Sequence, residues 1–474
     1  MRVAILSPEA VPFAKVGGLA DVSGALTKAL HAADIDSFLI LPFYDQIDQS
    51  LVSGVVFEDL EVQWRGKQTR IRVLKSDTLN APTYLIDAPY YFARGKIYGD
   101  NDDFERFAFF CRAAVALMHR LDEAPDVVHL NDWQCGFAAV ELRARRRHEK
   151  FFRQTKTLCS IHNMAYQGLF DPDNLWWMDF ASYTDDFMVR GAASALKAGL
   201  LASDALSTVS PRYAQEIQTP EQGYGLDWLT RARRDRLVGI TNGVDYEVWN
   251  PETDPNIAAN YSAEDLTGKR ECKIDLLRRF GLPAEPERPI IAIISRLVAQ
   301  KGYDLIREAA RGILDTGAFF IALGAGAQEY EAFLQSWHDA APRRVGIYKG
   351  FAGEPLAHQI EAGADIFLMP SQYEPCGLNQ MYSMRYGTIP VVRATGGLDD
   401  TVQNFEVKTG SGNGFKFGRY AATALLEKIR EGLYFYNQPE TWKQIQLNGM
   451  TIDNSWSAAA QKYIKLYEHI PGPL

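Results

Sequence analysis

The chain has 474 residues, of which 47% are hydrophobic and 23% charged, and its formal net charge is −9. This composition is typical of a globular protein with enough apolar material for two large domains, and it excludes a disordered chain. The acidic balance argues against a nucleic-acid partner, and no apolar run is long enough to predict a membrane span.

The first half of the chain alternates short apolar runs with longer helical patterns. Strands are predicted at residues 2–6, 38–41, 127–130, 157–161 and 205–209. This alternation predicts an α/β unit in which helices cover both faces of a mostly parallel sheet. Ligands of such sheets bind beyond the carboxyl ends of the strands, so the loops that directly follow strands are the places to look for chemistry.

The first of these loops contains a glycine pair. Lys15-Val16-Gly17-Gly18-Leu19-Ala20-Asp21 follows the first strand and leads into a helix predicted over residues 22–32. Paired glycines let a backbone approach phosphate closely, and a helix N-terminus adds N–H donors. Lys15 adds a full positive charge. A purely structural turn is the alternative, and the absence of the GxGxxG pattern weakens a dinucleotide-binding interpretation.

Two more strand-end loops carry polar side chains. Asp132 follows the strand at 127–130 and is placed either to accept a hydrogen bond from an acceptor hydroxyl or to cap the next helix. His162 and Asn163 follow the strand at 157–161. A lone histidine is often structural, but its place at a strand end favours contact with a ligand, where it can donate to a sugar hydroxyl or to the reacting oxygen.

The region after His162 raises two weaker possibilities. An aromatic cluster could cover sugar rings, although core packing is the favoured interpretation; its members are Trp176, Trp177, Phe180 and Tyr183. The pairs Asp34/Asp36 and Asp171/Asp173 have the DxD form that holds metals in some transferases. Neither pair closely follows a predicted strand, so no metal site is expected.

A second α/β series begins after a turn-rich segment at residues 250–255, which predicts a hinge. Its strands are predicted at residues 290–295, 319–323, 366–369 and 389–392. The chain is therefore expected to form two doubly wound units in tandem. If they face each other, the active site lies in the cleft between them.

The first strand of the second series ends at Arg296, and Lys301 follows at the start of a predicted helix. Two cations and a helix end can hold one diphosphate and stabilise the charge that grows on a departing nucleotide. Two solvated cations on a loop are the alternative.

The next candidate loops lie after the strands at 366–369 and 389–392. Glu374, between Tyr373 and Pro375, can hydrogen-bond sugar hydroxyls or stabilise an oxocarbenium-like centre, or be a structural loop acid. Thr395, Gly396 and Gly397 follow the next strand.

The five cysteines, Cys111, Cys135, Cys159, Cys272 and Cys376, are far apart and form no CxxC pair. They predict neither a disulfide framework nor a zinc ribbon, and a reducing cytosol is the simplest location.

Taken together, KVGGLADV, HLNDW, SIHNMAYQG, ITNGVD, SRLVAQKG and SQYEPCGLNQMYSMRYGTIPVVRATGGL resemble bacterial glycogen synthases and plant starch synthases, in order and spacing, over nearly the whole chain. The resemblance implies the GT-B fold: a Rossmann-like acceptor-side domain at 1–248, a Rossmann-like nucleotide-sugar domain at 249–455, and a segment at 456–474 whose helix crosses back onto the first domain.

The resemblance also implies the reaction. Glucose passes from ADP-glucose to the non-reducing end of an α-1,4-glucan, such as a maltooligosaccharide, glycogen or starch, with retention of configuration. No metal or cofactor takes part, and the leaving phosphate assists the incoming 4-hydroxyl. A bacterial cytoplasmic location is implied, with a plastid possible if a transit peptide has been removed.

Matched residue by residue, the family assigns catalytic roles to His162, Glu374, Arg296 and Lys301. His162 would contact the transferred glucose, and Arg296 and Lys301 would hold the diphosphate, to which the backbone of Thr395, Gly396 and Gly397 would also donate. Lys15, Gly17 and Gly18 would face the phosphates or the glucosyl unit. The remaining expected binding residues are Asp21, Asp132, Asn163, Asn242, Phe351, Cys376, Gly377 and Leu378.

The chain departs from the family pattern in three places. The region 90–103 is shortened, Ala327 stands where members often have Asp, and Phe351 stands where a Tyr near the base is common. Phe351 keeps a stacking face but lacks the hydroxyl, which leaves ADP-glucose against UDP-glucose open. The alternatives are a catalytically weak glucan-binding or priming homologue, and a nicotinamide dehydrogenase, which would need a complete GxGxxG.

Overall fold

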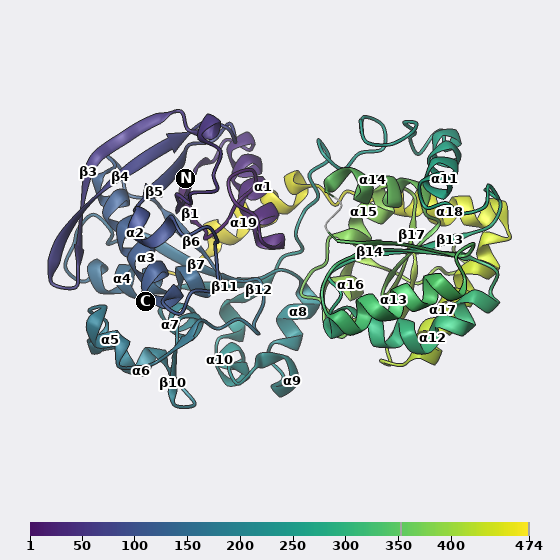
Figure 1. Cartoon of the computed structure of the whole chain (residues 1–474). Coiled ribbons are helices and arrows are strands. Elements are labelled where there is room, and N and C mark those ends of the chain that lie inside the picture. The colour runs from purple at the N-terminus through teal and green to yellow at the C-terminus, as the bar shows by residue number, and fades with distance from the viewer. Residues whose placement is uncertain (351–352, 473–474) are drawn as a thin grey trace. The chain divides into compact units, whose positions relative to one another are not determined.

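The computed structural model describes residues 1–350 and 353–472, which form two compact units (Figure 1). The first unit comprises Met1–Gly243 and the segment from Trp456 onward, and the second comprises Val244–Ser455. The segment 250–255, predicted as a hinge, is instead part of the second unit. Asp254 is buried there, accepts a hydrogen bond from the Tyr386 hydroxyl (2.6 Å) and pairs with His358 Nδ1 (2.6 Å).

In the described residues, the first unit contains a nine-stranded sheet of order β12-β11-β7-β6-β1-β2-β5-β4-β3. All neighbouring strands are parallel except those that pair with β4. The five predicted strands are confirmed, while β3, β4, β5 and β12 were not predicted. The strands are β1 (Arg2–Leu6), β2 (Asp36–Pro42), β3 (Gly54–Trp64), β4 (Lys67–Ser76), β5 (Thr83–Asp87), β6 (Val127–Asn131), β7 (Lys156–Ile161), β11 (Ala205–Thr208) and β12 (Leu237–Gly239).

Helices cover this sheet, and the same unit also contains a small second sheet of order β8-β10-β9. The helices are α1 (Gly18–Ala32), α2 (Pro89–Phe92), α3 (Asp103–Arg120), α4 (Gly136–Arg146), α5 (Asn174–Trp177), α6 (Thr184–Phe187), α7 (Ala195–Ala202), α8 (Pro211–Glu216), α9 (Pro220–Gly223) and α10 (Asp227–Ala232). The small strands are β8 (Leu169–Phe170), β9 (Met188–Val189) and β10 (Ala192–Ser194). Helix α1 starts at Gly18, four residues before its predicted start, so the glycine pair forms the helix N-terminus itself.

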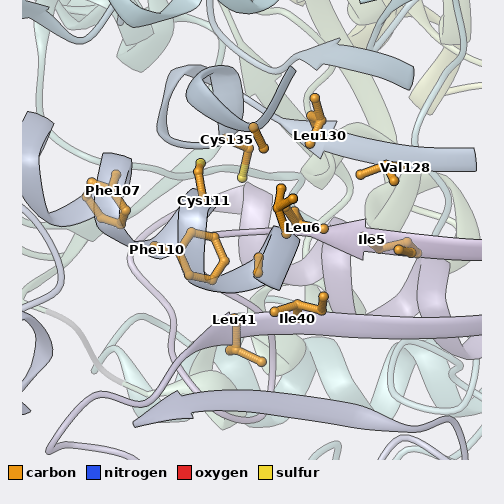
Figure 2. Packing of buried hydrophobic residues seen from close by; sticks show 14 of the residues in the cluster. Ile5, Leu6, Ile40, Leu41, Phe107, Phe110, Cys111, Val128, Leu130 and Cys135 are labelled. Carbon is orange, nitrogen blue, oxygen red and sulfur yellow. The ribbon is translucent and has the colours of Figure 1, made fainter. Parts of the chain in front are cut away.

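The core of the first unit lies where the middle strands meet α3. Apolar side chains from β1, β2 and β6 pack against Phe107, Phe110 and Cys111 of α3 (Figure 2). The Cys111 thiol also donates to the carbonyl of Gln134 (3.2 Å). This contact fastens the turn that follows Asp132 to the core, so a site residue is held by buried packing.

Helix α19 (Trp456–His469) confirms the predicted terminal helix and returns to the first unit. It lies beside α1 (Figure 1) and buries Trp456, Tyr463 and Tyr467 in that unit's core. The Tyr467 hydroxyl is 2.8 Å from Nδ1 of the buried His129 of β6. The first unit is therefore completed by residues that come after the second unit in the sequence.

The described part of the second unit contains a fully parallel sheet of order β15-β14-β13-β16-β17-β18. If these six strands are numbered 1 to 6 as they occur along the chain, the order is 3-2-1-4-5-6, which is that of Rossmann-type dinucleotide-binding folds. The four predicted strands are confirmed, and β15 and β18 were not predicted. The strands are β13 (Ile290–Ile294), β14 (Phe319–Gly324), β15 (Val345–Lys349), β16 (Ile366–Met369), β17 (Ile389–Arg393) and β18 (Phe415–Phe417).

Two helix layers enclose this second sheet, each over its own apolar cluster. Helices α12, α13 and α17 cover one face, and α11 and α14 cover the other (Figure 1). The helices are α11 (Thr267–Arg279), α12 (Tyr303–Asp315), α13 (Gln328–Ala340), α14 (Glu354–Gly363), α15 (Asn379–Arg385), α16 (Gly396–Thr401), α17 (Ala422–Tyr436) and α18 (Pro439–Met450). Among the described residues, no helix of either unit combines the length and apolarity that a membrane crossing requires.

Candidate active site

The predicted site residues lie on loops at the ends of strands, near the point in each sheet where the strand order reverses. In the first unit the strand order reverses between β1 and β6, and in the second between β13 and β16. Loops that leave neighbouring strands in opposite directions open a crevice at that point, which is where α/β sheets bind ligands. The loops after β1, β6 and β7 carry one group of candidates, and the loops after β13, β16 and β17 carry the other.

Glu9, a residue that the sequence analysis missed, holds the glycine turn of the first unit in place. The buried carboxylate of Glu9 accepts hydrogen bonds from the N–H groups of Val16 (2.5 Å) and Gly17 (3.2 Å). Burial raises the pKa of Glu9, although these two N–H groups act in the opposite direction. The N–H of Gly17 is therefore already engaged, and a carboxylate lies where a phosphate was one of the expected ligands.

Gly17 itself is not required by the protein around it. Its φ of −143° is extended, and an added Cβ would meet nothing closer than Glu9 Oε1 at 3.8 Å. Space kept free beside a helix N-terminus favours close approach by a ligand. Lys15, exposed at the mouth of this turn, pairs with Asp21 of α1 (Nζ to Oδ1, 2.7 Å).

Asp132 and His162 come together at the ends of β6 and β7. Asp132 is buried, and its Oδ1 accepts the backbone N–H of His162 (2.7 Å). Its side chain makes no cap to the following turn, so the capping alternative is wrong. Its backbone has φ +57° and ψ −172°, a region that residues other than glycine rarely occupy and that costs of order 1–3 kcal/mol. Strain of this kind is concentrated at functional sites.

Burial shifts the pKa of both side chains toward the neutral form. Burial raises the pKa of Asp132 to about 7, more than the backbone N–H groups of His162 and Asn163 lower it, and the nearby Glu9 carboxylate adds to the rise. Burial likewise lowers the pKa of His162 to about 3. His162 Nε2 is 2.9 Å from Oδ1 of Asn131, the last residue of β6 and another residue that the sequence analysis did not single out.

The raised pKa of Asp132 predicts a pH-dependent cost to stability. The unfolded carboxyl, with a pKa of about 3.9, loses its proton first, so ionisation destabilises the folded state as pH rises from about 4 to about 7. Over this window the wild type is expected to lose stability relative to Asp132→Asn, by at most about 1.4 kcal/mol per pH unit. Urea unfolding of both proteins across the window measures this. Parallel pH profiles of the two proteins would contradict it.

In the second unit, Lys301 and Glu374 form a close pair. Lys301 Nζ donates to Glu374 Oε2 (2.5 Å), which also accepts the hydroxyl of Ser371 (3.1 Å). Glu374 is only 7% exposed, yet its Oε1 has no hydrogen-bond partner among residues 1–350 and 353–472. That oxygen is also absent from the set of fully buried, unpartnered atoms, so it is open to a ligand.

A side-chain and a backbone hydrogen bond join the loop after β13 to the loop after β16. Gln300 Nε2 donates to the carbonyl of Tyr373 (3.2 Å), and Gln372 N–H donates to the carbonyl of Gln300 (2.7 Å). Gly302 has φ +77°, and a Cβ there would lie 2.2 Å from the carbonyl of Pro370. Glycine is therefore needed at position 302 for the two loops to meet, and the meeting point fixes Lys301 beside Glu374.

In the loop after β17, at least two of the three backbone N–H groups expected to bind phosphate are engaged within the protein. Gly396 has φ +44°, and a Cβ there would lie 1.9 Å from the carbonyl of Glu374. The N–H of Gly397 donates to the carbonyls of Glu374 (3.2 Å) and Pro375 (3.1 Å), and that of Thr395 donates to Arg393 (3.0 Å). The amides of Thr395 and Gly397, predicted as phosphate donors, are thus engaged within the protein. They brace the loop that carries Glu374.

The remaining candidates differ in how they are placed. Arg296 is exposed at the end of β13 and has no ion pair within the described ranges. Cys376, Gly377 and Leu378 continue the Glu374 loop toward α15. The Oδ1 of Asn242, after β12, is buried without a hydrogen-bond partner in the described part of the chain, a costly state unless a ligand satisfies it. Phe351 lies outside the described residues.

The DxD pairs and the aromatic cluster are the two weaker motifs of the sequence. No group of three or more acidic, histidine or cysteine side chains with metal-binding geometry occurs in residues 1–350 and 353–472. The expectation of core packing is wrong for half of the aromatic cluster. Phe180 is buried, but Trp176 and Trp177 of α5 are 76% and 61% exposed. Core contacts in this segment come instead from their neighbours Leu175 and Met178.

Comparison with known proteins gives one consistent result. Residues 2–232 match the family model described as the starch synthase catalytic domain, and residues 277–446 match the model of glycosyl transferases group 1. The chain is 44% identical to a glycogen synthase of Geobacillus thermodenitrificans, over 99% of this chain and 98% of that protein. It is 41% identical to a glycogen synthase of Bacillus cereus strain Q1, over 99% of this chain and the whole of the relative.

Solved structures agree. The catalytic domain of starch synthase IV from Arabidopsis thaliana, bound to ADP and acarbose, matches with a TM-score of 0.91 and 33% identity, covering 98% of both chains. A sucrose-phosphate synthase from Thermosynechococcus elongatus matches with a TM-score of 0.62 and 19% identity, over 99% of this chain and 98% of that one. The second likeness concerns the fold alone.

Proposed function

The chain belongs to the glycogen and starch synthase family of glycosyltransferases, and from this premise we propose how its residues carry out glucosyl transfer. The enzyme is a glycogen or starch synthase of the GT-B fold. We propose ADP-glucose as its donor and the 4-hydroxyl at the non-reducing end of an α-1,4-glucan as its acceptor. The observation that carries the assignment is the Lys301–Glu374 pair (2.5 Å), which lies where the strand order of the second sheet reverses. Arg296, on the same loop as Lys301, is exposed.

The second unit supplies the charges for the leaving group. Arg296 and Lys301 would bind the diphosphate of the donor, and their positive charge would stabilise the negative charge that grows on ADP as the bond from C1 to the phosphate oxygen breaks. Because Glu374 shares Lys301, it orients that ammonium group. Its open Oε1 would accept a hydroxyl of the transferred sugar or stabilise the positive charge that develops at C1.

The first unit would hold the glucosyl unit and the acceptor. The contacts around Glu9 favour the sugar over the phosphates as the neighbour of the Gly17 turn, since a buried carboxylate there would repel a phosphate and can accept hydrogen bonds from sugar hydroxyls. His162 would contact the transferred glucose, with Asp132 holding its backbone. Asn163 and Asn242 would bind donor or acceptor hydroxyls.

Retention would follow from attack on the face that the leaving group vacates. The acceptor O4 forms a bond to C1 as the C1–phosphate bond breaks, and the proton of the 4-hydroxyl passes to the departing phosphate oxygen. ADP leaves with that proton, and the glucan is longer by one residue. Two fixed cations, Arg296 and Lys301, would neutralise the diphosphate without a metal ion, so we propose that no metal or cofactor is needed. We also propose a cytoplasmic location, because all five cysteines are free and buried.

Transfer of labelled glucose to maltooligosaccharide and to glycogen tests the function, with ADP-glucose and UDP-glucose compared in the presence of a chelator. We expect strong, chelator-resistant incorporation from ADP-glucose and much weaker incorporation from UDP-glucose. Preference for UDP-glucose would overturn the donor assignment. Glucan binding without incorporation from either donor would instead identify a binding or priming homologue.

A further inference from the structure

The hydrogen bonds around His162 fix which of its ring nitrogens carries a proton. The Leu6 carbonyl can only accept, so the Asn131 side-chain atom that lies 2.9 Å from it is the donor, Nδ2. Asn131 Oδ1 is thereby turned toward His162 Nε2, at 2.9 Å. An amide oxygen can only accept, so Nε2 must carry the hydrogen. In a neutral ring, Nδ1 is then a bare lone pair that can accept but not donate.

This arrangement is held firmly from several directions. Asn131 is buried at the end of β6, between β1, which provides the Leu6 carbonyl, and β7, which leads into His162. The backbone N–H of His162 is fixed by Asp132 (2.7 Å). Rotation of the Asn131 amide would place its oxygen against the oxygen of the Leu6 carbonyl, an unfavourable contact between two acceptors in a buried place, whichever tautomer His162 adopts.

The other ring nitrogen is open. His162 Nδ1 has no hydrogen-bond partner in residues 1–350 and 353–472, and it is absent from the set of fully buried, unpartnered atoms. It is therefore reachable from outside the protein. Because burial lowers the pKa of His162 to about 3, the ring stays neutral at the pH values at which enzymes are usually assayed.

We propose that Asn131 is a positioning residue that locks His162 in the Nε2–H tautomer, so that His162 recognises the transferred sugar only by accepting a hydrogen bond from one of its hydroxyls. The inference rests on the proposed function, in which His162 contacts the glucosyl unit. It replaces the prediction that His162 donates to a hydroxyl or to the reacting oxygen. It also defines a selectivity: a donor sugar whose hydroxyl at that position is replaced by a group unable to donate is rejected.

Long-range ¹H–¹⁵N spectra of protein labelled at histidine test the tautomer without any substrate. The His162 signals, assigned by their loss in His162→Ala, are expected to show a protonated Nε2 and an unprotonated Nδ1. Asn131→Ala is expected to shift them toward a mixture of tautomers. A wild-type spectrum with a protonated Nδ1 would overturn the inference, and this result does not depend on the folding of Asn131→Ala.

Deoxyfluoro analogues of ADP-glucose test the recognition. Fluorine replaces a hydroxyl in size but cannot donate a hydrogen bond, so at the position that His162 reads we expect the wild type to disfavour the analogue by at least tenfold in kcat/KM beyond its intrinsic reactivity. His162→Ala measures that intrinsic part, because it lacks the acceptor. In Asn131→Ala the ring can also adopt the Nδ1–H tautomer, so the penalty at this one position is expected to fall at least threefold.

A matched control separates positioning from stability. Asn413 of the second unit is also buried, and it donates through Nδ2 to the carbonyl of Thr401 (2.9 Å) and accepts through Oδ1 from Gln403 N–H (2.7 Å). Asn413→Ala is expected to lower thermal stability while leaving the fluorine penalty unchanged. An unchanged penalty in folded Asn131→Ala would overturn the proposal. If the wild type transfers no glucose from ADP-glucose, the proposed function fails, whereas the tautomer is still decided by the spectra.

Discussion

Replacing Glu374 by alanine is expected to lower kcat by roughly 10²–10⁴-fold, with a much smaller change in KM for the glucan. Glu374 lies almost completely buried against Lys301, and its Oε1 is open to the sugar. A carboxylate in such a place interacts most strongly with the positive charge that develops in the transition state. Steady-state transfer from ADP-glucose measures the effect, and a loss smaller than about tenfold would remove Glu374 from the proposed centre.

Two further substitutions test whether the loss of activity comes from the loss of the charge at Glu374. Glu374→Gln keeps the shape and the contact with Ser371 but removes the charge, so it is expected to be nearly as inactive as the alanine variant. Glu361 provides the matched control, because it is a buried glutamate of the same unit that also accepts a serine hydroxyl (Ser383, 2.6 Å). Burial raises the pKa of Glu361 to about 8, so Glu361→Gln is expected to retain activity.

Lys301→Ala is expected to lower kcat/KM for ADP-glucose by about 10²–10³-fold, since it removes a charge-assisted contact to the diphosphate and leaves Glu374 without its partner. Calorimetric titration with ADP is expected to show at least tenfold weaker binding. Lys301→Arg should not restore the activity, because Lys301 Nζ donates to Glu374 as a compact ammonium group and the planar guanidinium of arginine has a different donor geometry.

The control for Lys301 is Lys428 of α17, which pairs with Glu431 at 2.7 Å on the same unit. Lys428→Ala is expected to leave both ADP binding and transfer unchanged. ADP affinity that survives Lys301→Ala would place the diphosphate elsewhere, and Arg296 alone would then have to hold it.

The central strands were predictable because they are continuous apolar runs, as in β1 and β13, which strands buried on both faces require. Strands β3 and β4 were missed because they are half exposed; in β3 the buried Leu60, Val62 and Trp64 alternate with exposed polar residues. The short β18 has too few residues to show a pattern. The hinge was misplaced because local turn chemistry at 250–255 cannot reveal that Asp254 is anchored by the distant His358 and Tyr386.

The site was predictable as a set of residues but not as a set of contacts. Strand-end position and the family resemblance indicated His162, Arg296, Lys301 and Glu374. Glu9 also follows a strand closely, and that position was the available signal for it. Nothing in the sequence could show that Gly397 uses its N–H inside the protein, that Asn131 orients His162, or that Trp176 and Trp177 point outward. These facts depend on the directions of backbone N–H groups and side chains, which only the fold sets.

The return of α19 to the first unit has a consequence for how the protein is made. During synthesis the ribosome completes the whole of the second unit before Trp456, Tyr463 and Tyr467 emerge to fill the core beside α1. Domains generally fold as they are translated, but here the unit that is translated first lacks part of its interior until the end. A nascent first unit would keep an apolar groove open along α1 throughout that interval, so chaperone binding to ribosome-bound chains should persist until α19 is released. Premature termination just before Trp456 would leave a finished second unit attached to an unfinished first one.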